Sequence, residues 1–309
     1  MQPPLPWGLK ARTQRETPVT EIIRSLDDID PGYRVLYCDL WGCLHDGVRV
    51  FPAAAAALER FRAQGGTVVL ITNSPRPAGS VALQLDSLGA PRSCWDLIVS
   101  SGDAAQAAMV AGQFGRRVYH IGPERDRVFF EDGAGRPLDI ARVPLEEAEG
   151  IVCTGLFDDR LETPDDYRAA ILAGKAKGLK LLCANPDVIV DVGDRRIYCA
   201  GAIAAAYADA GGRSYYFGKP HPPIYALARE KLGAMGVAVQ PDEILCVGDG
   251  IATDVAGAMG EGLDVLFVTG GLAAEETATD RASGPDPLLL TAYLAAARLG
   301  PRYAIGCLR

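Results

Sequence analysis

Residues 33–44 read YRVLYCDLWGCL, and this stretch decides the predicted fold. Its first six residues are mostly apolar or aromatic, as in a short buried strand, and Asp39 follows them directly. A second apolar run, residues 67–71 (TVVLI), ends at Thr72. Between the two runs, an alanine-rich stretch starts at Pro52 and ends before a pair of glycines, which is typical of a helix. The opening therefore predicts a β-α-β unit with a polar residue at the end of each strand.

The same alternation continues along the chain. Strands are predicted at residues 96–100, 117–121, 150–154, 180–184, 214–217, 243–247 and 264–268. Helices are predicted at residues 104–112, 164–178, 201–211, 222–232, 253–261 and 287–298, and a hairpin across Gly193-Asp194. Strands that alternate with helices indicate an α/β fold, a doubly wound and mostly parallel sheet covered on both faces. Ligands bind at the carboxyl ends of the strands in such sheets.

Composition limits the classes of function. The chain has 309 residues, 49% of them hydrophobic and 23% charged, enough for one large or two modest domains. Its net charge of −8 argues against a nucleic-acid partner, which requires a basic surface. The chain has eight cysteines and no C-x-x-C pair, which indicates buried free thiols in a reducing compartment. We see neither a signal peptide nor a membrane-spanning apolar run, so we expect a cytoplasmic protein with no membrane partner.

Polar residues at four predicted strand ends indicate one site. They are Asp39, Thr72 with Asn73, Lys219, and Asp249 with Asp254 five residues later. Because the carboxyl ends of parallel strands meet at one edge of the sheet, we expect these side chains to converge. Carboxylate oxygens suit Mg²⁺, a lysine offers a charge to phosphate, and one carboxylate could attack phosphorus. The set predicts an Mg²⁺-dependent site that handles phosphate.

Each residue alone has a more ordinary interpretation. An aspartate after a strand is usually a turn or helix-cap residue, and Lys219 before Pro220 could be a solvated loop lysine. Other phosphate-binding folds fit poorly. The spacing before Lys219 is wrong for a P-loop, and residues 248–253 lack the third glycine of a dinucleotide-binding fingerprint. A receiver-type signalling domain is much shorter than this chain and has no place for the insert before Lys219. The ordered combination of strand-end residues is what favours a phosphate site.

The combination also resembles a known family. Residues 39–44 (DLWGCL) are similar to the first motif of the haloacid dehalogenase superfamily, an Asp-x-Asp-Gly-x-Leu pattern. Residues 71–74 (ITNS), 217–220 (FGKP) and 248–258 (GDGIATDVAGA) resemble its second, third and fourth motifs. The resemblance runs from about residue 33 to 270. The long insert before the third motif resembles the class IIA, NagD-like subgroup, which includes phosphatases of nucleotides, sugar phosphates and pyridoxal phosphate.

The resemblance implies a Rossmann-like core and an inserted α/β cap that sets substrate specificity. Residues 1–30 would form a lead-in, residues 31–102 and 201–309 the core, and residues 103–200 the cap. It also implies that the substrate is a small phosphorylated metabolite, and it is compatible with a homodimer.

The resemblance further implies a role for each site residue. The catalytic residues would be Asp39, the nucleophile that forms an aspartyl-phosphate, with Thr72 and Lys219. Phosphate would be bound by Thr72, Asn73 and Lys219, and Mg²⁺ by Asp39, Asp249, Asp254 and the backbone carbonyl of Trp41. Asn185 and Asp187 are the candidate substrate contacts from the cap, although an Asx-Pro turn explains them equally well.

The first motif departs from the family pattern, because Trp41 stands in place of its second aspartate. In phosphatases of the family that carboxylate protonates the leaving group and then activates water. Such general acid–base catalysis is typically worth about 10²–10⁴-fold in rate. His45 or Asp46 could substitute for it, the substrate could carry a good leaving group, or the bond cleaved could differ, as in phosphonates or haloacids. A weak or degenerate homologue, with Trp41 as a pocket wall, would instead bind a phosphorylated ligand without fast turnover.

Overall fold

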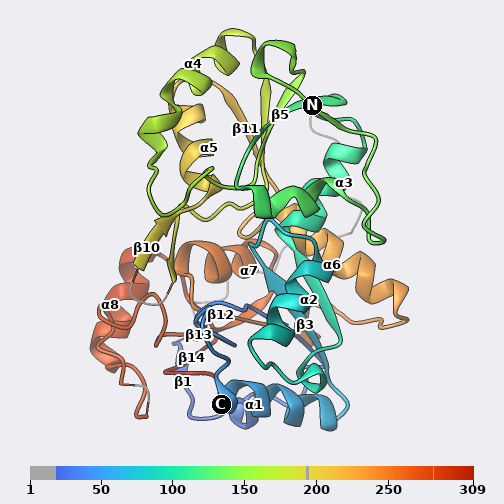
Figure 1. Cartoon of the computed structure of the whole chain (residues 1–309). Coiled ribbons are helices and arrows are strands. Elements are labelled where there is room, and N and C mark those ends of the chain that lie inside the picture. Colours follow the sequence, from blue (N-terminus) through green and yellow to red (C-terminus); the bar gives the residue numbers. More distant parts are fainter. Residues whose placement is uncertain (1–18, 193–194, 281) are drawn as a thin grey trace, which may run out of the picture.

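The computed structural model describes residues 19–192, 195–280 and 282–309, which form two α/β units (Figure 1). The larger unit holds a seven-stranded parallel sheet in the order β1-β14-β13-β12-β2-β3-β4. Its strands are β1 (Glu21–Ile22), β2 (Val35–Cys38), β3 (Thr67–Thr72), β4 (Leu97–Ser100), β12 (Ile244–Gly248), β13 (Asp264–Val268) and β14 (Tyr303–Ile305). The predicted parallel α/β core is confirmed.

Helices cover both faces of this sheet. Leu36 of β2 packs in one apolar cluster with residues of α1 (Pro52–Ala63) and α2 (Ala78–Ser87). The next residue, Tyr37, belongs to a second cluster with α6 (Pro222–Ala234), α7 (Ala256–Gly260) and α8 (Pro287–Ala297). Successive side chains of a strand point to opposite faces, so a strand covered on both sides is apolar at every position. This burial holds the polar residues that follow β2 at the edge of the sheet.

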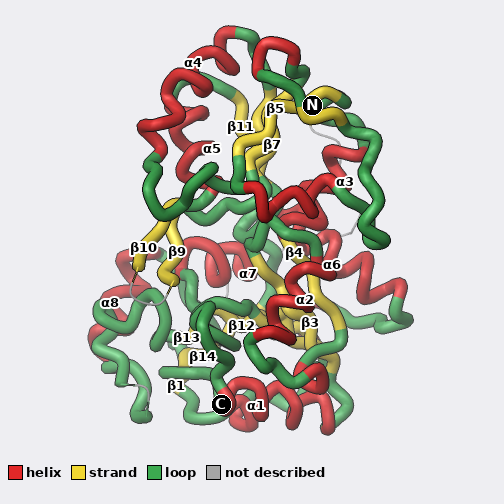
Figure 2. The backbone as a smooth tube through the Cα atoms, in the orientation of Figure 1, coloured by secondary structure: helices red, strands yellow, loops and turns green. Residues whose placement is uncertain are grey.

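The second unit includes most of the expected cap, and we refer to it as the cap. Its five-stranded parallel sheet has the order β11-β8-β7-β5-β6 (Figure 2). These strands are β5 (Arg117–Ile121), β6 (Ala141–Arg142), β7 (Gly150–Cys153), β8 (Lys180–Cys183) and β11 (Arg213–Tyr216). Helices α4 (Arg168–Ala176) and α5 (Ala200–Asp209) pack on one face, and α3 (Ser101–Val110) packs on the other.

The predicted hairpin is present as the antiparallel strands β9 (Ile189–Val192) and β10 (Arg195–Tyr198), and its turn at Gly193-Asp194 lies outside the described residues. Within the described ranges, no helix is long and apolar enough to cross a membrane.

Two features of the sheets differ from the sequence-based expectation. The cap sheet includes β11, which pairs with β8, so we place the return to the core at Phe217, later than the expected residue 200. A helix followed by a strand reads the same in either unit, which is why the sequence pattern did not reveal the boundary. The expected lead-in contributes β1 to the core sheet, where it pairs with β14. Neither strand was predicted, because two or three residues are too few to show a period.

Candidate active site

The site lies where the carboxyl ends of strands from both sheets meet. β2, β3 and β12 of the core end directly before or at Asp39, Thr72 and Asp249. From the cap, the segment after β11 leads to Lys219 and the segment after β8 leads to Asp187. Hydrogen bonds connect these segments, so the predicted convergence of the strand ends is observed.

Lys219 is the centre of the site. Its Nζ lies 2.7 Å from Oδ1 of Asp39 and 2.7 Å from Oδ1 of Asp254, and its side chain is 3% exposed. Burial acts to lower the pKa of Lys219, but the charges of Asp254 and Asp39 more than offset it and hold that pKa well above its ordinary value. The lysine is therefore a fixed positive charge between two carboxylates.

Asp39 and Asp249 are buried carboxylates whose negative charges are less fully compensated than the positive charge of Lys219. Burial and the charge of Asp254 raise the pKa of Asp39 to about 7, against the opposing effect of Lys219. Burial and the charges of Asp39 and Asp254 raise the pKa of Asp249 well above its ordinary value, and one of its oxygens accepts the N–H of Leu272 at 3.0 Å. Three carboxylates thus face a single ammonium, so a cation would stabilise their ionised forms.

The donor atoms fit a divalent metal ion. One carboxylate oxygen each from Asp39 and Asp249 and the Sγ of Cys43 all lie within 4.8 Å of one another. The carboxylate pair suits a hard ion such as Mg²⁺, whereas burial and the neighbouring carboxylates raise the pKa of the Cys43 thiol and keep it neutral. The sequence did not predict Cys43 at the site, because a cysteine in an apolar run reads as core. A role for the Trp41 carbonyl stays a prediction.

Gly42 allows the loop after β2 to approach Asp249. Its φ is 73°, in the left-handed region that favours glycine. A Cβ added at this position would lie 2.1 Å from Oδ2 of Asp249. The loop backbone therefore packs directly against the carboxylate and limits where it can point.

Asp254 holds Lys219 in the structure. Its Oδ1 is bonded to Nζ of Lys219, and its Oδ2 accepts the N–H of Gly250 at 3.1 Å and the hydroxyl of Thr253 at 3.3 Å. A π-helical turn, Ile251–Val255, precedes α7 where a regular helix was predicted, and it carries Asp254. Since both oxygens are engaged, we assign Asp254 to positioning, and its direct ligation of a metal stays a prediction.

Asn73 connects the core to the cap. Its Oδ1 accepts the N–H of Lys219 at 2.7 Å, and its Nδ2 donates to the carbonyl of Lys219 at 3.0 Å and to Oδ1 of Asp187 at 2.8 Å. Both N–H groups of the amide are used, so we assign Asn73 to positioning the third motif and the cap. Thr72 is 1% exposed and its hydroxyl oxygen accepts the N–H of Ser74 at 3.2 Å, and among the described residues that hydroxyl makes no other hydrogen bond.

The two cap candidates differ in their roles. Oδ1 of Asn185 accepts the N–H of Asp187 at 3.0 Å, which is an Asx turn. That turn directs the Asp187 side chain toward Asn73 of the core. Burial raises the pKa of Asp187, and the hydrogen bond from Asn73 acts to lower it. Of the pair, Asp187 is the residue that the structure brings into the site.

Proteins of similar sequence and structure show which family this chain belongs to. Residues 36–133 match a family model described as haloacid dehalogenase-like hydrolase, and residues 216–296 match a HAD-hydrolase-like model. A crystal structure of a haloacid dehalogenase-like hydrolase from Brucella suis 1330 is 41% identical, with a TM-score of 0.80, and the match covers 93% of this chain and 100% of that one. The chain belongs to the haloacid dehalogenase-like hydrolase family.

Two named relatives also match. The ribonucleotide monophosphatase NagD of Escherichia coli K12 is 28% identical over 243 residues, covering 77% of this chain and 88% of NagD. The 5′-nucleotidase YutF of Bacillus subtilis is 25% identical over 255 residues, covering 82% of this chain and 93% of YutF. The predicted haloacid dehalogenase, class IIA resemblance is confirmed.

In this family member, the rings of Trp41 and His45 pack together within the loop after Asp39. A Cβ added at Gly47 would lie 2.3 Å from the Trp41 indole, so the ring rests on the Gly47 backbone. His45 is 1% exposed, its ring lies 5.1 Å from that of Trp41, and its Nδ1 accepts the N–H of Gly47 at 3.0 Å. Burial lowers the pKa of His45 to about 4, so the ring is neutral. The predicted substitute His45 is therefore held within the loop.

Asp46, the other predicted substitute, closes the turn of the same loop. Its Oδ1 accepts the N–H groups of Val48 at 2.9 Å and Arg49 at 2.8 Å, and its Oδ2 pairs with the Arg49 guanidinium at 3.3 Å. Both carboxylate oxygens are thus engaged on the surface. The structure brings neither substitute to Asp39 in any described contact.

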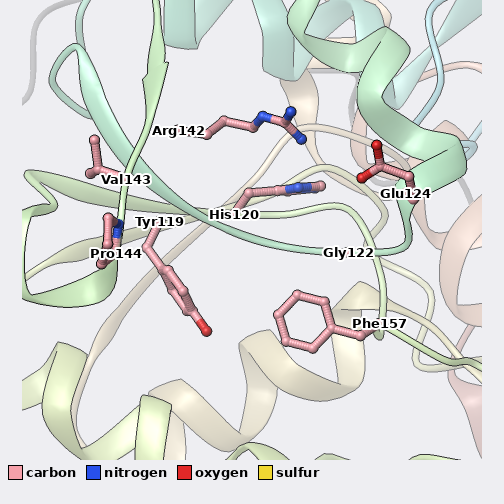
Figure 3. A pocket seen from close by; sticks show the side chains of 8 residues that line it. All are labelled: Tyr119, His120, Gly122, Glu124, Arg142, Val143, Pro144 and Phe157. Carbon is pink, nitrogen blue, oxygen red and sulfur yellow. The ribbon is translucent and has the colours of Figure 1, made fainter.

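A hollow of about 630 Å³ lies on the cap, and none of the site residues named above lines it (Figure 3). Figure 3 shows the Arg142 side chain extending beside His120, with Glu124 beyond it, while Tyr119 and Phe157 form the opposite side. Gly122, Val143 and Pro144 complete the lining. All eight lining residues belong to the cap, and its charged groups have opposite signs, so we assign it no ligand.

Proposed function

We propose that this hydrolase is an Mg²⁺-dependent phosphatase that transfers a phosphoryl group from a small metabolite to Asp39. The observation that carries the proposal is the position of Asp39, a buried carboxylate at a strand end with Lys219 Nζ at 2.7 Å and Asp249 beside it. The relatives named ribonucleotide monophosphatase and 5′-nucleotidase support phosphate esters as substrates.

The site residues have distinct parts in this reaction. A carboxylate oxygen of Asp39 forms a bond to phosphorus while the bond from phosphorus to the leaving oxygen breaks, giving an aspartyl-phosphate. Lys219 and the Thr72 hydroxyl hold phosphoryl oxygens, and Asp254 keeps Lys219 in place. A metal ion held by Asp39 and Asp249 would supply positive charge to the phosphoryl oxygens and favour the ionised carboxylates.

The cap supports a small substrate. Asp187 lies over the site through its bond to Asn73, so a ligand must fit between the cap and the core residues. Nucleotides, sugar phosphates and pyridoxal phosphate are the substrate types that we propose. A cytoplasmic location is part of the proposal and is supported by the eight free cysteines, all of which lie in the described residues.

The test is phosphate release from a panel of phosphoesters with Mg²⁺, with Asp39→Asn as the matched control. The proposal predicts turnover that requires both Mg²⁺ and Asp39. Trp41, which replaces the usual acid, favours one alternative, a homologue that binds a phosphorylated ligand without turning it over. Ligand binding by calorimetry, with no phosphate release above the Asp39→Asn control, would establish that alternative instead.

A further inference from the structure

Among the described residues, the loop after Asp39 places no carboxyl or imidazole group free to donate a proton to a leaving oxygen. Lys219 carries a proton, but two carboxylates hold its Nζ. Trp41 has an indole, which is not an acid, and it packs on the loop backbone. His45 and Asp46 are bonded to backbone N–H groups of the same loop. The first-motif loop thus provides a nucleophile without an acid.

We infer that the site acts on phosphoryl compounds whose leaving group departs as a stable anion, as in aryl phosphates and acyl phosphates. The inference rests on the proposed function and narrows its substrates, because nucleotides, sugar phosphates and pyridoxal phosphate have alkoxide leaving groups and would be the slow members of the proposed range. In the first step the Asp39 oxygen bonds to phosphorus, and the electron pair of the broken P–O bond leaves on the departing oxygen. No proton is required when that oxygen belongs to a phenolate or a carboxylate. An alkoxide leaving group requires one, and the missing acid is typically worth about 10²–10⁴-fold.

The second step, hydrolysis of the aspartyl-phosphate, lacks the same acid–base group. Water must attack the phosphorus of the aspartyl-phosphate, release its proton to solvent, and free Asp39 and inorganic phosphate. Without a positioned base this step is slow and is the same for every substrate. With good substrates the phosphoenzyme therefore accumulates, and release of the first product shows a burst followed by a common steady-state rate.

Asp187 is a competing donor on the cap side. Its Oδ1 accepts a hydrogen bond from Nδ2 of Asn73, which leaves its second oxygen as a place for a proton. If Asp187 protonated the leaving oxygen, its removal would make the rate more dependent on the leaving group. An Asp187→Asn variant separates the two accounts.

The experiment measures kcat/KM for a series of para-substituted phenyl phosphates, which have nearly the same size but different leaving-group pKa values. The wild type should show a steep fall in kcat/KM as the leaving-group pKa rises. Trp41→Phe and Asp187→Asn should keep that slope, whereas Trp41→Asp should flatten it by accelerating the poorest substrates about 10²-fold or more. Thermal unfolding of each variant checks that the loop still folds.

Two results would overturn the inference. A shallow slope in the wild type with turnover that depends on Asp39, or a slope that steepens in Asp187→Asn, would show that an acid is present while the phosphatase proposal stands. No turnover of any member above the Asp39→Asn control would overturn the phosphatase proposal as well. The wild-type slope alone decides the inference if Trp41→Asp fails to fold.

Discussion

Replacing Lys219 by methionine should strongly destabilise the fold when no metal is bound. The side chain is 3% exposed, and its Nζ contacts Asp39 and Asp254, each at 2.7 Å. Methionine keeps the length of the stem but leaves two buried carboxylates without their counter-charge. Breaking a buried ion pair in this way costs about 3–5 kcal/mol in the free energy of unfolding. Lys219→Met should therefore lose an amount of this size at pH 7 in EDTA.

The assay is urea unfolding of wild type and variant, with an exposed ion pair as the control. Arg34 pairs with Glu243 at 3.3 Å, but its side chain is 59% exposed, so Arg34→Met should cost less than about 1 kcal/mol. The loss in Lys219→Met should shrink as pH falls, because the unpaired carboxyls then bind protons more tightly in the folded state than in the unfolded state. Adding Asp254→Asn should recover part of the loss, since it removes one of the two charges.

A loss below about 1 kcal/mol in Lys219→Met, equal to that in Arg34→Met, would refute this reasoning. It would mean that Lys219 does not compensate the carboxylates in solution. A loss that did not change between pH 7 and pH 5 would refute the assignment of the cost to ionised carboxylates. Each comparison uses the unfolding midpoint together with the slope of the transition, so a change in the denatured state can be recognised.

Three further predictions concern the metal site. The pKa of Asp39 is raised from its ordinary 3.8 to about 7, so ionisation of Asp39 lowers the free energy of unfolding as pH rises through that window. Asp39→Asn should therefore be more stable to urea than wild type at pH 8 in EDTA, and should differ little from it at pH 4. Mg²⁺ at 100 times its Kd should stabilise wild type by about 2.7 kcal/mol in thermal unfolding, and Asp249→Asn should lose most of that gain. Gly42→Ala should abolish the Mg²⁺ effect and lower the free energy of unfolding by roughly 1–3 kcal/mol. Gly65 also has a positive φ, but a Cβ added there would have nothing within 4 Å, so Gly65→Ala should retain the Mg²⁺ effect.

The core could be predicted from sequence because burial on both faces makes each strand a continuous apolar run. β2 and β12 are examples, and each is followed directly by the polar residue that builds the site. β1 and β14 escaped prediction because they gain their stability from pairing with each other and with β13, a long-range effect that two or three residues do not reveal. Helix α2 was also missed, since its sequence AGSVALQLDS has only two buried residues.

The site could be predicted as a set of residues, but its internal contacts could not. The carboxyl-end rule placed Lys219, Asp39 and Asp254 together, and it could not tell that both carboxylates would bind one Nζ. Asn73 was expected to bind phosphate. Whether an amide faces a ligand or a backbone segment depends on a packing between residues 73 and 219 that no local pattern records.

The most direct test of the account asks whether Asp39 receives the phosphoryl group. Wild type mixed with p-nitrophenyl phosphate and Mg²⁺, quenched in acid and digested, should carry one acid-stable, base-labile phosphoryl group on Asp39 by tandem mass spectrometry. Lys219→Met should carry much less and Asp39→Asn none. Phosphorylation of another residue, or substrate turnover without a phosphorylated Asp39 at any time in the burst, would contradict the account.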